Sequence, residues 1–440
     1  MQNFFTDSLL AGRLVSVFTG FLTMSGIYYF CQKNLNKKTA ILASILYIFI
    51  PIFSFYDRQA LMESSIAACG VWGLIFLSNF LNEKKIRLAI CLGVVLGMGF
   101  FIKSSSLLFL ISSILIITIY LIKEKNKGVI MQGLFATSFS FLCVVFLLII
   151  NPQFWQTLSK NYVFTLSANE LLGFPFLKWM SNLFGNLEIS FFYLTPVIFF
   201  AFVLGILKII IDKNKKLLVL LFFILFSFLT ETLVTRLISD RYLVSVLPLF
   251  CIPVAYVVNT AFLKNKIFQA LVVLVLLLPA LFFTSIQIIS PVVYIKGMSQ
   301  FTKYYPSTYI DGFTSGYGIN ETVSFIKNRQ KLKPFIVTVA ENTGNPESAM
   351  LVYFNYMKYK NVKSTYLDAR IAGNALDNYD CLTSKDPFYF VSREEQLAGM
   401  DRFLQKIKTI KNPYGSNTIG IYTLKTNCRG KTFNLVLNKQ

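Results

Sequence analysis

Three polar stretches of the sequence carry the residues whose types and spacing could support chemistry. The first runs from Asp57 to Glu63 between two apolar runs, the second follows Phe101, and the third precedes another apolar run. Their candidate residues are Asp57, Arg58 and Glu63, then Lys103, then Arg236, Arg241 and Tyr242. Guanidinium and ammonium groups suit a phosphate oxyanion, and a carboxylate can accept a proton. The pattern predicts a cationic pocket with Glu63 and Asp57 as candidate catalytic carboxylates and the other five near a phosphate.

The residue types also limit which metal chemistry is open to the chain. It contains no His, which removes the commonest general base and metal ligand. Most zinc and non-haem iron chemistry is therefore excluded, and a hard divalent cation such as Mg²⁺ or Mn²⁺ would need carboxylate ligands. Glu63 is the candidate metal ligand.

Each polar stretch also has a plain structural interpretation. Glu63 opens a helix, where the helix dipole favours a carboxylate without any function. Lys103 can extend to the membrane interface, and the loop from Arg236 to Arg241 can be a solvated anchor. These interpretations stay open beside the functional ones.

The composition places these residues in a membrane protein. Of 440 residues, 55% are apolar and 14% are charged, whereas soluble proteins are about 45–50% apolar. A span needs about 20 apolar residues, and about ten such runs precede residue 291. They lie approximately at 14–31, 40–55, 65–80, 88–102, 107–122, 129–150, 189–207, 217–234, 242–261 and 267–289. We expect a transmembrane domain over residues 1–290.

The loops between these runs alternate in charge, which predicts an orientation. Fifteen Lys and Arg residues lie in one set of loops, at 33–38, 84–87, 123–127, 208–216 and 264–266. The other set holds Arg13, Arg58, Lys103, Lys160, Lys178, Arg236 and Arg241. By the positive-inside rule the first set is cytoplasmic. The three polar stretches and everything after residue 290 then lie outside, and the net charge of +21 needs no nucleic acid as a partner.

Residues 291–440 read as a small extracytoplasmic α/β domain. Strand-like segments at 335–339, 364–367, 388–391 and 418–424 alternate with helix-like segments at 321–330, 347–358 and 393–406. Cys381 and Cys428 both fall in this domain, and an oxidising compartment would allow them to pair. No nucleotide-binding Gly-rich loop is present, because Gly316-Tyr317-Gly318 is too short. Lipid phosphate therefore fits the outer cationic pocket better than a nucleotide.

Four stretches together resemble the GT-C integral-membrane glycosyltransferases, the class of protein O-mannosyltransferases and lipid A aminoarabinose transferases. They are Ser8–Leu14, Asp57–Glu63, Gly97–Ser104 and Arg241–Leu243 followed by Pro248. The resemblance implies a polyprenyl- or dolichyl-phosphate-linked sugar as donor, an outward active site in the plasma membrane, and usually inversion at the anomeric carbon. It also implies that Glu63 lies near the metal or acceptor, and that Lys103 and Arg241 lie near the donor phosphate.

The resemblance has one departure at the start of the chain. Members of the family begin with a helix and a large outer loop that carries an acidic residue, and this sequence starts after that point. Asp7 is a poor substitute for that acid. The charge pattern also makes the first apolar run enter from outside, so we expect a missing upstream helix, a separate subunit, or an inactive chain.

Two other functional classes stay open from the sequence. One is a transporter or flippase of lipid-linked saccharides, which would move the sugar without breaking its phosphate bond. The other is a non-catalytic membrane partner whose outer domain binds glycan. The acceptor of a transferase, whether lipid, protein or glycan, is not specified by any motif.

Overall fold

The computed structural model describes most of the chain. It covers residues 8–435 apart from 124–125, 151–163, 262–265, 311–314, 330–334, 341–343, 357–361, 368–377, 385–386, 395–396, 398–399, 413, 416–417 and 427–428. Asp7, Lys160 and Cys428, with the loop residues 125 and 264, lie outside the described residues. The chain forms two compact units, Leu9–Tyr305 and a second made mainly of Pro306–Gln440.

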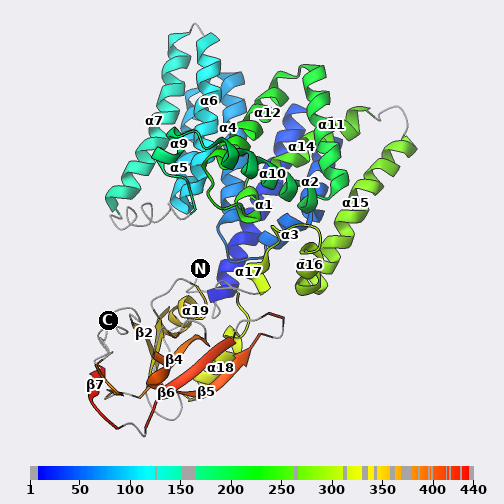
Figure 1. The fold of residues 1–440 in the computed structure, drawn as a ribbon. Helices are drawn as coiled ribbons and strands as arrows, with labels where there is room; N and C mark the ends of the chain where they lie inside the picture. Colours follow the sequence, from blue (N-terminus) through cyan, green and yellow to red (C-terminus); the bar gives the residue numbers. More distant parts are fainter. Residues whose placement is uncertain are drawn as a thin grey trace. The chain divides into compact units, whose positions relative to one another are not determined.

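The first unit is a bundle of helices (Figure 1). Spans are helical because backbone groups in a bilayer must be satisfied within the segment, which only helices and closed barrels achieve. The helices are α1 (Ser8–Asn34), α2 (Lys37–Phe49), α3 (Pro51–Tyr56), α4 (Glu63–Glu83), α5 (Ile86–Ile102), α6 (Leu107–Lys123), α7 (Lys127–Ile150), α9 (Ala168–Leu172), α10 (Phe176–Tyr193), α11 (Pro196–Asp212), α12 (Lys215–Val234), α13 (Asp240–Leu243), α14 (Cys251–Ala261), α15 (Lys266–Ile289) and α16 (Pro291–Met298).

Several of these helices can span a membrane, so the chain is a multi-pass membrane protein. Among the described residues, five are long and apolar enough, namely α1, α4, α7, α12 and α15, and a bent pair raises the total to six. Three shorter apolar helical segments lie at Ile86–Ile102, Ser104–Tyr120 and Leu247–Ala261. The expected total of about ten crossings stays a prediction.

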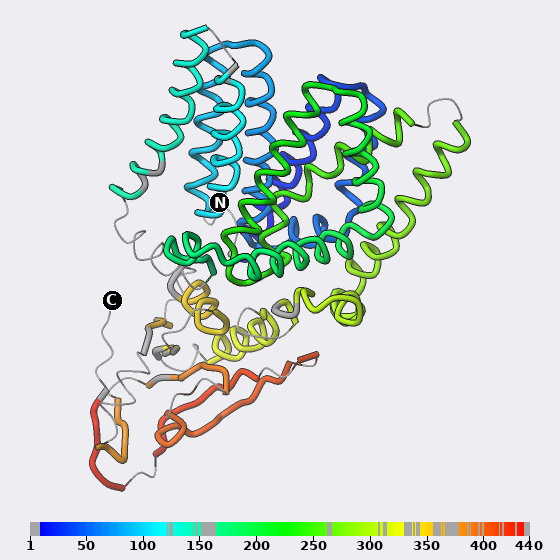
Figure 2. Tube along the Cα trace, turned by 45° about the horizontal axis from the view of Figure 1, so that its top comes forward, coloured from blue at the N-terminus to red at the C-terminus, as the bar shows by residue number. Residues whose placement is uncertain are grey.

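One expected span, residues 189–207, is wrong as a single straight helix. The chain breaks between α10 and α11, which meet at 115°. Pro196 causes the break, because it lacks a backbone N–H and stands at the start of α11. Figure 2 shows α10 running across the ends of the upright helices, whereas α11 runs alongside them. A similar break at Ile50–Pro51 divides the expected span 40–55 into α2 and α3.

Close packing against α1 positions the segment from Asp57 to Glu63. A Cβ at Gly20 would lie 2.3 Å from the Asp57 carboxylate, and one at Gly12 would lie 2.9 Å from Ala60. Small residues allow helices in a membrane to approach this closely. The Ser16 hydroxyl adds a hydrogen bond to the Leu61 carbonyl at 3.0 Å. The segment is therefore held along one side of α1.

The second unit is built on a five-stranded mixed sheet in the order β2-β1-β4-β6-β5. Its strands β2 and β4 pair in parallel with β1, while β6 pairs antiparallel with β4 and β5. The strands of this unit are β1 (Phe335–Ala340), β2 (Val362–Leu367), β3 (Cys381–Ser384), β4 (Phe388–Arg393), β5 (Leu404–Lys411), β6 (Thr418–Leu424) and β7 (Thr432–Leu435). The four expected strands thus coincide with β1, β2, β4 and β6.

The helices of this unit follow expectation in part. Helix α18 (Ile319–Arg329) packs Val323 and Ile326 into the core beside Val337 of β1. Helix α19 (Glu347–Leu351) continues as a π-helical turn over Val352–Tyr356, within the segment expected to be helical. The expected helix at 393–406 is wrong, because Arg393 ends β4 and Leu404 begins β5.

The cysteines also differ between the two units. Cys31, Cys69, Cys91, Cys143 and Cys251, all in the helical unit, are free. Cys381 in β3 is disulfide-bonded. A disulfide forms and persists in an oxidising compartment.

Candidate active site

Three loop-end side chains converge in the helical unit. Glu63 is the first residue of α4, Lys103 directly follows α5, and Arg241 lies in α13. The Lys103 ammonium donates to Glu63 Oε1 at 2.8 Å. The Arg241 guanidinium donates to the same oxygen through Nε and to Glu63 Oε2 through Nη2, the latter at 3.4 Å. The structure therefore brings together one carboxylate and two cations from the three polar stretches.

The exposure of the three side chains gives this cluster a direction. Glu63 is only 2% exposed, whereas Lys103 and Arg241 are 26% and 37% exposed. The buried carboxylate thus holds the two cations from behind while part of each faces outward. One carboxylate cannot neutralise two cations, so these three groups keep a net charge of +1 for an anionic ligand.

The Tyr242 ring lies beside the Lys103 ammonium. The Lys103 ammonium lies 5.5 Å from the centre of the Tyr242 ring, which is a cation–π distance. Glu231 lies in the last turn of α12. Its Oε1 accepts a 2.6 Å hydrogen bond from the Thr235 hydroxyl. Sequence analysis included Glu231 in a span and missed it, although a lone carboxylate in the apolar run Phe-Ser-Phe-Leu-Thr-Glu was a usable signal.

Asp57 begins the segment that Glu63 ends, and its contacts differ from those of Glu63. Its carboxylate accepts a 2.7 Å hydrogen bond from the Tyr47 hydroxyl and abuts the backbone of α1 at Gly20. Burial raises the pKa of the Asp57 carboxyl to about 6, and neighbouring hydroxyl groups oppose that shift. Neither Lys103 nor Arg241 is among the causes of the shift. Asp57 therefore belongs to the packing of α1 and α2 rather than to the cationic cluster.

A pH dependence of stability follows from Asp57. Its folded-state pKa exceeds its ordinary value of 3.8, so ionising it costs folding free energy. The free energy of unfolding should fall as pH rises from about 4 to about 6, by about 2 kcal/mol, and then level off. Asp57→Asn should remove this slope, which thermal unfolding of detergent-solubilised protein from pH 4 to pH 7.5 can measure. An unchanged slope in the variant would assign it to other groups.

Asp240 anchors Arg241 from the neighbouring position. Asp240 is buried, and it accepts a 2.9 Å hydrogen bond from the Tyr56 hydroxyl. Burial raises the pKa of the Asp240 carboxyl. Tyr56 and Glu63 lie on either side of the segment 57–62. Their contacts with Asp240 and Arg241 hold α13 against that segment. The Asp240 carboxylate is therefore engaged by the Tyr56 hydroxyl.

Arg58 and Arg236 make other contacts. Arg58 Nε donates to the Ser54 carbonyl at 2.7 Å. Arg236 pairs with Glu170 at 2.6 Å, beside a β-bridge between Thr165 and Thr235. Of the seven site residues expected from sequence, these contacts bring together Glu63, Lys103, Arg241 and Tyr242.

The cluster does not fit a metal site. Both Glu63 oxygens already accept hydrogen bonds from cationic groups. Over the described ranges, no three His, Cys, Asp or Glu side chains are grouped as metal ligands. The Mg²⁺ or Mn²⁺ expected from the sequence stays a prediction.

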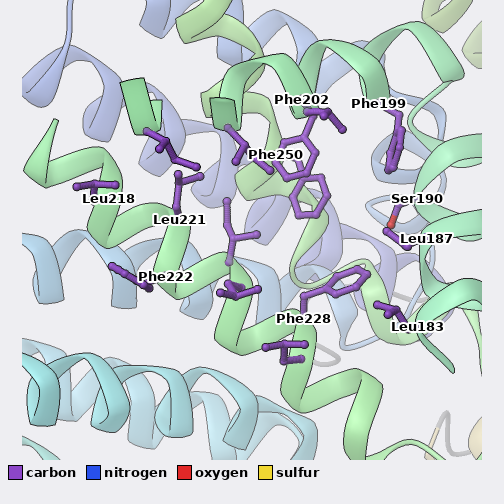
Figure 3. A pocket seen from close by; sticks show the side chains of 16 residues that line it. Leu183, Leu187, Ser190, Phe199, Phe202, Leu218, Leu221, Phe222, Phe228 and Phe250 are labelled. Atoms are coloured by element: carbon purple, nitrogen blue, oxygen red, sulfur yellow. The ribbon is translucent and has the colours of Figure 1, made fainter. Parts of the chain in front are cut away.

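A cavity of about 460 Å³ lies between α10, α11 and α12 (Figure 3). Its lining is apolar except for Ser190, and the rings of Phe202 and Phe250 stack at 3.8 Å. Asn182 joins α10 to the end of α12, because its amide donates hydrogen bonds to the carbonyls of Thr232 and Thr235. Helices α10 and α12 therefore contribute both to the cavity and to the contacts at the end of α12.

Residues 1–155 match the family model described as dolichyl-phosphate-mannose-protein mannosyltransferase. The resemblance drawn from the sequence is therefore confirmed.

One solved structure shows a similar fold. ArnT from Cupriavidus metallidurans bound to undecaprenyl phosphate is similar with a TM-score of 0.51 at 11% identity, over 93% of this chain and 83% of that one. The same protein in the apo state gives a TM-score of 0.47 at 10% identity, with the same coverage. No protein with a curated description matches this sequence.

Proposed function

We propose that this protein is a membrane glycosyltransferase that takes a sugar from a polyprenyl-phosphate carrier and attaches it to an extracytoplasmic acceptor. The observation that carries the proposal is the convergence of Lys103 and Arg241 on the buried Glu63. The fold supports it, because the similar ArnT structure holds undecaprenyl phosphate. The family model matched by residues 1–155 is that of a dolichyl-phosphate-dependent transferase.

In this proposal the two cations bind the donor phosphate. When the bond between the sugar and the phosphate breaks, negative charge accumulates on the phosphate oxygens. A guanidinium and an ammonium placed beforehand stabilise that charge without reorganisation. Glu63 holds both cations in place, and an acceptor hydroxyl attacks the anomeric carbon from the opposite face, with inversion.

We place the site and the second unit outside the plasma membrane. The charge pattern of the loops supports this orientation. The disulfide at Cys381 supports it independently, since thiols in the cytosol are kept reduced. A membrane-impermeant maleimide added to intact cells should label Cys381 only after an impermeant reductant is added. Labelling that requires lysis would place the unit in the cytosol.

The direct test is donor turnover. Membranes from cells that make the protein supply the acceptor, and a panel of undecaprenyl-phosphate-linked hexoses and pentoses supplies the donor. Release of undecaprenyl phosphate that depends on the protein and is accompanied by sugar in a new product supports the transferase. Transport of an intact donor across vesicles without release would favour a flippase instead.

A further inference from the structure

Arg241 lies on a helix that is too short to hold its own position. Helix α13 is a single turn, Asp240–Leu243. One turn is unfavourable in isolation, because it fixes several backbone angles for few hydrogen bonds. Contacts with other elements must therefore hold α13, and those contacts also decide where the Arg241 guanidinium lies.

Ser239 fixes the start of α13. Its hydroxyl oxygen accepts a 3.4 Å hydrogen bond from the Arg241 amide, and its hydroxyl donates to Asp240 Oδ1 at 3.2 Å. A capping side chain of this kind supplies a partner for an amide that has none within the helix. Both contacts are local, so they do not attach α13 to the rest of the bundle.

Asp240 attaches the buried side of α13 to α3. Asp240 is 6% exposed, and its Oδ2 accepts a 2.9 Å hydrogen bond from the Tyr56 hydroxyl. Tyr56 is the last residue of α3, and its buried ring packs edge to face against Phe55 at 5.2 Å. A buried polar group that loses its partner keeps the full cost of its desolvation, so this contact is costly to break.

Asp240 and Arg241 point in different directions from the same turn. Consecutive residues of a helix lie about 100° apart around its axis. Asp240 therefore meets Tyr56 in the interior, while Arg241 meets Glu63 and keeps 37% of its side chain exposed.

The two contacts of α13 lie at the two ends of one fixed segment. Tyr56 stands directly before the segment 57–62, and Glu63 stands directly after it. The segment lies close against α1, since a Cβ at Gly12 would come within 2.9 Å of the Ala60 side chain. The hydrogen bond from Tyr56 and the ion pair with Glu63 thus hold α13 to the same support.

We propose that Tyr56 and Asp240 are positioning residues for Arg241, an assignment that rests on the proposed function. Each Asp240 oxygen accepts a hydrogen bond from a hydroxyl in the interior, so Asp240 acts through Arg241 and does not touch the substrate. The bond from Tyr56 holds α13 so that the guanidinium is in place before the donor phosphate gains charge. A donor fixed beforehand stabilises a developing oxyanion without reorganisation, and residues behind it supply that order.

The test compares Tyr56→Phe with Tyr256→Phe in the full-length protein. Tyr56→Phe removes one hydroxyl and no ring atom, so the packing of the core is kept. Tyr256→Phe is the matched control, because it also removes a hydrogen bond from a tyrosine to an aspartate, Asp212, at the end of α11 that precedes an expected cytoplasmic loop. Turnover is the release of undecaprenyl phosphate in membranes, as described above. Binding is the Kd of the purified protein for undecaprenyl phosphate alone.

For Tyr56→Phe we expect turnover to fall about tenfold and Kd to rise by a similar factor, the effect of about one lost hydrogen bond. Tyr256→Phe should match the parent. Asp240→Asn keeps an oxygen that can accept from the Tyr56 hydroxyl, so it should lose less turnover than Asp240→Ala.

A positioning role also makes the effect of Tyr56→Phe depend on Arg241. In an Arg241→Ala background, Tyr56→Phe should change turnover and Kd by less than about twofold, because no guanidinium is left to place. In a Lys103→Ala background it should keep most of its effect, since Arg241 is then the remaining cation of the cluster. A merely structural role would give the same factor in every background.

Three results would overturn the assignment while leaving the transferase intact. They are parental turnover in Tyr56→Phe, an equal loss in Tyr256→Phe, and an equal effect of Tyr56→Phe with and without Arg241. A parent protein that neither binds undecaprenyl phosphate nor releases it from any donor would instead overturn the proposed function, and the role of Tyr56 and Asp240 with it.

Discussion

Arg241→Ala should lower donor turnover by about 10²–10³-fold, the usual effect of removing one preorganised donor to a developing oxyanion. Arg241 provides two N–H groups that point at Glu63, and 37% of its side chain remains exposed to meet a ligand. Lys103→Ala should have a comparable effect, because its ammonium is the second cation of the cluster. Arg241→Lys keeps the charge but loses the planar fork, so we expect an intermediate loss.

The measurement is release of undecaprenyl phosphate, together with its Kd. A phosphate-binding role requires that Kd rises and turnover falls in the same variant. Lys178→Ala is the matched control. Lys178 lies on α10, on the side of the bundle that we expect to face outward, and within the described residues no ion pair joins it to the cluster. If Lys178→Ala lowered turnover as much as Arg241→Ala did, the effect would come from general surface charge and the site assignment would be wrong.

The core of this site could be predicted from sequence because it lies at helix ends. Glu63 begins one apolar run, Lys103 ends another and Arg241 begins a third, and helices of alternating direction bring those ends to the same side of a bundle. No further geometry was needed to expect an ionic cluster there. Tyr242 followed Arg241 by adjacency alone.

Only the three-dimensional structure shows which of the predicted residues make contacts away from the cluster. Arg236 carries the same charge as Arg241 five residues away, but the strand-like bridge of Thr165 to Thr235 turns it to Glu170. Glu231 was missed because one carboxylate changes the mean hydropathy of an apolar run very little. The packing of α12 against α4, α6 and α10 is a long-range property that a single apolar run does not reveal.

The fold shows the same limit in its second unit. β-branched and aromatic residues predicted β1, β2, β4 and β6 correctly. The expected helix at 393–406 extended into the segment Leu404–Lys411, which reads Leu-Gln-Lys-Ile-Lys-Thr-Ile-Lys and is a strand. It is an edge strand paired only with β6 in its sheet, and lysines on an edge strand discourage pairing with another chain. Position in the sheet, rather than propensity, decided this segment.

The role of Glu63 gives the second large effect. If Glu63 holds the two cations rather than acting as the base, Glu63→Ala should destabilise the protein by about 3 kcal/mol, since it leaves Lys103 and Arg241 side by side without their carboxylate. Glu63→Gln should do the same to a smaller extent. Combining Glu63→Gln with Lys103→Met should recover part of the loss, with a coupling free energy of about 1 kcal/mol or more.

Undecaprenyl phosphate provides a sharper version of this experiment. Its phosphate can replace the negative charge that Glu63→Gln removes, so adding it should raise the thermal midpoint of the variant more than that of the parent. Thermal unfolding in detergent, with and without the lipid, measures both midpoints. A Glu63→Gln variant with parental stability, equal stabilisation by the lipid and abolished turnover would mean that Glu63 is the base. That result would leave the two cations in place and assign the proton transfer to Glu63, the first residue of α4.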